Sequence, residues 1–135
     1  MVIVAIDVGT VRVGCAWSDS SVQLAFPVAV WERAQGRAEQ ALLEELKVRN
    51  AELLVVGLPL DANGNQTAIC QSILAFVRRL SKRCSIRIVY VDEAFSSDDA
   101  LSRLQSVGAE PRELDAYAAC LILERYFAVG SCGEP

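Results

Sequence analysis

The stretch VIVAIDVGTVRVGCAWSD, residues 2–19, decides the fold of this chain. Residues 2–8 are apolar except for Asp7, which predicts a buried strand. Residues 11–18 alternate between apolar residues and polar or small ones, the period-two pattern of a half-exposed strand. The Gly9-Thr10 turn between them predicts that the two strands pair as a hairpin. Asp7 is therefore a carboxylate near the end of a buried strand, and a buried charge needs either a place in a turn or a cationic partner.

Periodicity and turn residues define the other elements. Strands are predicted over residues 22–31, 53–57 and 86–93, and helices over 36–49, 68–83, 97–107 and 112–128. Pro27 places the third strand at a sheet edge, and Thr67 is the expected N-cap of the helix 68–83. Three antiparallel strands followed by parallel crossovers predict an α/β fold, a mixed five-stranded sheet with helices on both faces. We expect one domain over residues 1–129 and a loose tail over 130–135.

The composition excludes several kinds of chemistry. The chain has 135 residues, no histidine and five cysteines, none of them in a C-x-x-C pair. The absence of histidine removes Ser-His-Asp and Cys-His nucleophilic catalysis and disfavours a zinc or copper centre. Scattered cysteines are typical of reduced thiols in a cytoplasmic protein. No apolar run approaches the roughly 20 residues of a membrane helix and no signal peptide is recognisable, so no membrane partner is expected.

The charge pattern gives two opposing indications about partners. The net charge of −4 disfavours nucleic acid, because proteins that bind it usually carry a basic excess. A basic cluster nevertheless lies in and after the helix 68–83, at Arg78, Arg79, Lys82, Arg83 and Arg87. Arginine suits bidentate phosphate contacts, although a solvated helix face is the simpler interpretation of such a cluster.

Three carboxylates lie where a strand or a buried helix does not ordinarily hold a charge. Asp7 is near the end of the first strand, Glu93 follows the last one, and Asp115 is in an apolar helix. Each alone has an ordinary explanation: a turn, a strand end, or a favourable charge at a helix N-terminus. Ligands gather at the carboxyl ends of parallel strands, so Asp7 and Glu93 reach one edge together if their strands are neighbours. Three crowded oxygen donors favour Mg²⁺ or Mn²⁺, and two such ions about 3.5–4 Å apart can cleave a phosphodiester.

Four blocks of the sequence, in order, resemble those of the YqgF/RuvX family. They are AIDVGTVRVGCAWSD, VVGLPLDANGNQT, VDEAFSSDDA and LDAYAACLILERYF, and together they span nearly the whole chain. The resemblance implies an RNase H-like fold and a cytoplasmic nuclease acting on structured nucleic acid. Members of this family are associated with maturing the 5′ end of pre-16S rRNA, and some with cutting Holliday junctions in DNA.

The resemblance also implies roles for individual residues. The acidic residues of the family fall on Asp7, Glu93 and Asp115, the same three that burial selects. Gly9, Thr10 and Arg12 fall on its first turn and strand, where Arg12 is expected to hold a phosphate. The chain departs from the family at Ala94, where an arginine is usual. Substrate affinity is therefore expected to depend on the cluster Arg78, Arg79, Lys82 and Arg83, or on a second subunit, and cutting two opposed strands of a junction favours a homodimer.

Two other interpretations stay open. The acidic balance and Ala94 are compatible with a non-catalytic nucleic-acid-binding or assembly module on the same fold. The D-x-G-T turn also resembles the phosphate loop of sugar kinases and actin, but those proteins close two such domains around ATP. DNA and RNA both remain candidate substrates, because the metal chemistry at a phosphodiester is common to them. The loop 57–67 is either a substrate contact or a connection with Asn-Gly turn chemistry.

Overall fold

The computed structural model describes residues 1–92, 106–108 and 110–130. The elements, in chain order, are β1 (Val2–Val8), β2 (Arg12–Asp19), β3 (Phe26–Glu32), a short 3-10 turn η1 (Ala34–Gly36), α1 (Arg37–Val48), β4 (Leu53–Leu58), α2 (Ala68–Ser81), β5 (Arg87–Asp92) and α4 (Pro111–Val129). The predicted helix 97–107 lies almost entirely outside the described residues, as does the tail beyond Gly130. Within the described part of the chain, no helix is long and apolar enough to cross a membrane.

The five strands form one mixed sheet in the order β3-β2-β1-β4-β5. β1 pairs antiparallel with β2, and β2 antiparallel with β3, while β4 runs parallel to both β1 and β5. The hairpin, the mixed sheet and the edge position of the strand with Pro27 are thus confirmed. β1 and β5 are not neighbours, because β4 lies between them.

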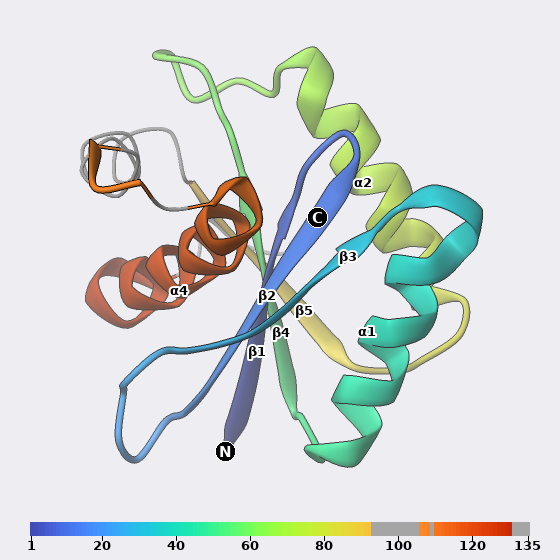
Figure 1. Ribbon diagram of the computed structural model, residues 1–135, viewed down its shortest axis with the longest axis vertical. Coiled ribbons are helices and arrows are strands. Elements are labelled where there is room, and N and C mark those ends of the chain that lie inside the picture. The colour runs from blue at the N-terminus through green and yellow to red at the C-terminus, as the bar shows by residue number, and fades with distance from the viewer. Residues whose placement is uncertain (93–105, 109, 131–135) are drawn as a thin grey trace.

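Helices cover both faces of the sheet, with α1 and α2 on one side and α4 on the other (Figure 1). The alternation along β1 shows why the strand is apolar almost throughout. Val4 and Ile6 join the core with α1 and α2, whereas Ile3 and Ala5 join the core with α4. A strand that is buried on both faces needs apolar residues at consecutive positions.

The third strand was predicted four residues too early, since β3 begins at Phe26. Asp19 explains the difference by building a turn after β2. Its carboxylate accepts hydrogen bonds from the backbone N–H and the hydroxyl of Ser21, at 2.9 and 2.7 Å. Gln23 then adopts a left-handed backbone with φ of 59°. The apolar residues before Phe26 therefore lie in the connection between β2 and β3, which starts with a turn organised by an aspartate side chain.

Thr67 occupies the expected N-cap position of α2 but does not cap the helix with its side chain. Its hydroxyl instead donates to the carbonyl of Pro59 at 3.1 Å, which fastens the start of α2 to the end of the preceding strand. The loop between them is organised by Asp61, whose carboxylate accepts from the N–H groups of Asn63 and Asn65, both at 2.9 Å. These contacts favour the connecting-loop interpretation of residues 57–67.

The described cysteines are free thiols, and three of them are core residues. Cys15 and Cys120 are buried, as expected from their apolar surroundings. Burial raises the pKa of Cys15 and raises that of Cys120 to about 11. Both thiols therefore stay protonated at neutral pH, which makes them packing groups and not nucleophiles.

Candidate active site

Gly14 brings α4 into direct contact with the sheet. A Cβ atom at this position would overlap the backbone carbonyl of Asp115 and lie 3.0 Å from the N atom of Ala116. Only glycine lets the helix backbone rest on β2 this closely. Gly14 is also the cross-strand partner of Asp7 in the β1–β2 pair. Because residues directly opposite in an antiparallel pair share a face, Asp7 lies on the α4 face beside the helical turn that carries Asp115.

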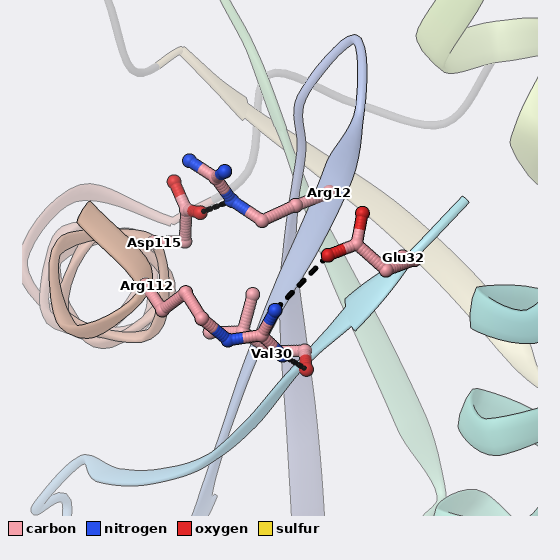
Figure 2. A network of polar contacts seen from close by, with 5 residues as sticks. All are labelled: Arg12, Val30, Glu32, Arg112 and Asp115. Carbon is pink, nitrogen blue, oxygen red and sulfur yellow. Dashed lines mark hydrogen bonds and ion pairs between the residues drawn. The ribbon is translucent and has the colours of Figure 1, made fainter. Parts of the chain in front are cut away.

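Asp115 has a cationic partner within the protein. The Nε atom of Arg12 donates to Oδ2 of Asp115 at 2.6 Å, and both side chains are about one-third exposed, 33% and 27% (Figure 2). This hydrogen bond, followed by the negative charge of Asp115, raises the pKa of Arg12. The sequence predicted a divalent ion as the compensation for Asp115, and the structure shows that Arg12 already provides one positive charge.

A second ion pair fastens the start of α4 to the edge strand. Arg112 Nη1 contacts Glu32 Oε1 at 3.0 Å, and its Nη2 donates to the carbonyl of Val30 at 2.8 Å (Figure 2). Glu32 is the cross-strand partner of Arg12. The Asp115–Arg12 pair therefore holds α4 to β2, and the Arg112–Glu32 pair holds it to β3. No local pattern predicts the Arg112–Glu32 pair, because its members lie 80 positions apart.

Arg33 holds the turn between β1 and β2 by hydrogen bonds to two of its carbonyl groups. The turn itself closes with a hydrogen bond from Gly9 N to the carbonyl of Arg12 at 2.8 Å. Arg33, just after β3, donates from Nη1 to the carbonyl of Gly9 at 2.8 Å and from its backbone N–H to the carbonyl of Val11 at 2.8 Å. Thr10 is exposed at the tip. Arg33 was not among the predicted site residues, because an isolated arginine after a strand carries no local signal.

Glu93, the third predicted carboxylate, lies outside the described residues, and so does Ala94. β5 is described as far as Asp92, and β4 runs between it and β1. Across the described ranges no cluster of three or more metal-binding side chains is present. The structure thus brings together Asp7, Asp115 and Arg12, at the end of the sheet that carries Gly9 and Thr10.

The basic cluster on α2 is not brought to these carboxylates. α2 packs on the face opposite α4 (Figure 1). Two basic residues, one in α2 and one just after it, contact α1. Arg79 pairs with Glu39 at 3.1 Å, and Arg83 donates to Gln40 at 2.7 Å. Arg83 also lines a cavity of about 790 Å³ with Arg87, at the start of β5 and hence at the opposite end of the strands. For Arg78, Lys82 and Arg83, a role in substrate binding stays a prediction.

Comparison with solved structures identifies the class of fold. The chain matches Thermus thermophilus RuvC with a TM-score of 0.62 and 15% sequence identity, over 98% of this chain and 99% of RuvC. The structure of the same protein in complex with a Holliday junction substrate matches with a TM-score of 0.61 and 16% identity, over 96% of each chain. The mixed sheet covered by helices on both faces is therefore an RNase H-like fold.

Comparison of sequences identifies the family. Residues 1–129 match the profile of the family described as RuvX, Holliday junction resolvase. A protein of Maridesulfovibrio salexigens, named as a candidate pre-16S rRNA nuclease, is 37% identical over 133 residues, covering 95% of this chain and 98% of its own. A protein of Haemophilus ducreyi with the same name is 32% identical over 130 residues, covering 93% and 94%. The chain belongs to the RuvX family of nucleases, as its four sequence blocks predicted.

Proposed function

We propose that this protein is a divalent-metal-dependent nuclease that hydrolyses phosphodiester bonds in structured nucleic acid. The observation that carries the proposal is the close contact of α4 with β2 at Gly14, which puts Asp7 and Asp115 on one face at one end of the sheet. The names of the relatives support pre-16S rRNA as a substrate, and the family description supports a four-way DNA junction. Both substrates are phosphodiesters and make the same demand on the site.

The donor set fits Mg²⁺ or Mn²⁺. Asp7 and Asp115 offer only oxygen, and the chain has no histidine. Hard divalent cations prefer such ligands. Glu93 lies outside the described residues, and we assign it as the third ligand because the acidic residues of the family fall on Asp7, Glu93 and Asp115. When bound, two such ions would activate a water and stabilise the leaving oxygen.

Arg12 is suited to position the phosphate. Its Nε is committed to Asp115, whereas no described residue accepts a hydrogen bond from its two Nη atoms. A guanidinium fixed through Nε presents both Nη atoms as a fork that matches two phosphate oxygens. Arg12 would then place the phosphate beside the carboxylates, and the exposed hydroxyl of Thr10 can add a further hydrogen bond at the turn.

The experiment that tests the proposal offers the purified protein a four-way DNA junction, single-stranded DNA and precursor 16S rRNA. Each substrate is incubated with Mg²⁺, with Mn²⁺ and with EDTA. We expect cleavage of at least one structured substrate with a divalent ion and none with EDTA. Binding without cleavage under every condition would overturn the nuclease proposal and leave a binding module. Cutting two opposed strands of a junction requires two active sites, so on that substrate we expect a two-fold dimer, measurable by light scattering.

Changing Arg12 to lysine tests the positioning role. Lysine keeps the charge but cannot hold Asp115 and a phosphate at the same time with a planar fork. We expect the cleavage rate at saturating substrate to fall by roughly ten-fold or more, the scale of a lost charge-assisted hydrogen bond. Thermal unfolding of both forms checks that the fold is intact. A lysine variant as active as the wild type would show that Arg12 acts through its charge alone.

A further inference from the structure

A polar cavity lies beside the Gly9–Arg12 turn, on the side away from Asp115. It has a volume of about 450 Å³ and is open to solvent between the turn, η1 and α2. Its lining consists of Thr10, Val11, Arg33, Ala34, Ser72 and Arg79. Two guanidinium groups and two hydroxyls therefore face one space, and none of the lining residues is acidic.

Arg33 is held in this cavity by three contacts. Its Nη1 donates to the carbonyl of Gly9 at 2.8 Å and to the hydroxyl of Ser72 at 3.0 Å. Its guanidinium lies over the ring of Phe76, 5.5 Å from the ring centroid. Both hydrogens of Nη1 are thus used, whereas no described residue accepts from Nε or Nη2. The side chain is fixed, and it keeps unused donors.

Arg79 adds a second positive charge to the same space. Its Nε contacts Glu39 at 3.1 Å, and no described residue accepts a hydrogen bond from its Nη atoms. Burial lowers the pKa of Arg33, and the nearby charge of Arg79 lowers it further, while Glu39 opposes the shift. Arg33 and Arg79 carry two positive charges and Glu39 carries one negative charge, so the three groups together are net positive. An anion with several acceptor oxygens would relieve this repulsion and use the free donors.

We propose that Arg33 and Arg79, together with the hydroxyls of Ser72 and Thr10, bind a backbone phosphate of the nucleic-acid substrate away from the bond that is cut. The proposal rests on the proposed function. The turn connects the two sites, since Arg33 holds Gly9 at one end of it and Arg12 holds Asp115 at the other. A strand that crosses this turn meets Arg12 on the α4 side and Arg33 on the α2 side.

The test compares Arg79→Gln with Arg37→Gln. Arg79 is half-exposed, and Arg37 is an exposed residue of α1 that does not line the cavity and donates to Gln35 at 3.0 Å. Both changes remove one positive charge. Equilibrium binding of the four-way junction and of precursor rRNA is measured in EDTA, so that no cleavage occurs, over a range of salt concentrations.

We expect Arg79→Gln to weaken binding by roughly five- to ten-fold and to lower the slope of log K against log salt by about 1, as for one lost phosphate contact. Arg37→Gln is expected to keep the slope of the wild type. Equal effects of the two variants would overturn the site and leave a general charge effect. A wild-type protein that binds neither nucleic acid fails at an earlier stage and overturns the proposed function as well.

The nature of the phosphate is tested by NMR on the wild type. The Nε–H signals of Arg33 and Arg79 are followed during titration with inorganic phosphate and, separately, with a short oligonucleotide. Shifts at lower concentrations of the oligonucleotide support a backbone phosphate. Shifts at equal or lower concentrations of inorganic phosphate would assign the cavity to a free phosphate and overturn the proposal.

Discussion

Asp7→Asn is expected to lower the single-turnover cleavage rate by more than about 100-fold. Removing a residue that only hydrogen-bonds a metal ligand already costs up to about 100-fold, and Asp7 is assigned as a ligand itself. Asparagine has nearly the same shape as aspartate but lacks the charge that holds a divalent cation. Asp7 stands opposite Gly14 and on the same face as Asp115, so the substitution removes one of the carboxylates that converge on the site. Manganese binding, measured by calorimetry, should weaken in parallel.

The fold of Asp7→Asn should persist. Asp7 is half-buried at the end of β1, and asparagine keeps the size of the side chain and an oxygen that accepts hydrogen bonds. We expect the free energy of unfolding to stay within about 1 kcal/mol of the wild type. Glu44→Gln, at an exposed position of α1, makes the same change of charge far from the site and should cleave normally. Wild-type cleavage by Asp7→Asn would refute the assignment of Asp7 as a metal ligand.

Gly14→Ala is expected to lower the free energy of unfolding by about 1–3 kcal/mol and to impair cleavage. The added methyl group meets the backbone of Asp115 and not the end of a flexible side chain. Relief therefore requires α4 to move away from β2. That movement would open the core formed by Ala119, Ile122 and Leu123 against the sheet and separate Asp115 from Asp7. Chemical denaturation measures the first effect, and cleavage well below the melting temperature measures the second.

Gly36→Ala separates displacement of the helix from simple loss of stability. Gly36 has φ of +69°, and a Cβ there meets no atom within 4 Å. Alanine is therefore strained by about 1–2 kcal/mol through its backbone alone. We expect this variant to be destabilised but to cleave at the wild-type rate while folded. If both glycine variants lose activity to the same extent, the close contact at Gly14 is not what sets the distance between the carboxylates.

The sequence predicted the parts of the fold that local pattern encodes. Burial on both faces of β1 leaves a continuous apolar run, and the edge position of β3 leaves room for Pro27, which lacks a hydrogen-bond donor. The sequence also predicted that Asp7 and Asp115 lie near each other, because several carboxylates at element ends together favour a shared site; their roles as ligands stay a prediction. Glu93 lies outside the described residues, so its place with them stays a prediction.

The side-chain contacts around the candidate site that the sequence did not predict join distant segments. Arg12 reaches Asp115 across 103 positions, and Arg33 reaches Ser72 across 39. Such partners depend on how the helices pack, which periodicity does not encode. The start of β3 was wrong for a different reason: a side-chain hydrogen bond from Ser21 to Asp19 overrides the strand propensity of the following apolar residues.

The ion pair between Arg12 and Asp115 compensates the charge of Asp115 from within the protein, without a metal ion. A protein with this arrangement can fold before a divalent metal ion binds, unlike small domains that stay unfolded until a metal binds. A chelator should then abolish cleavage without unfolding the protein. Each incoming cation also adds positive charge beside a guanidinium that is already present, so the loaded centre attracts a polyanion more strongly than the empty one.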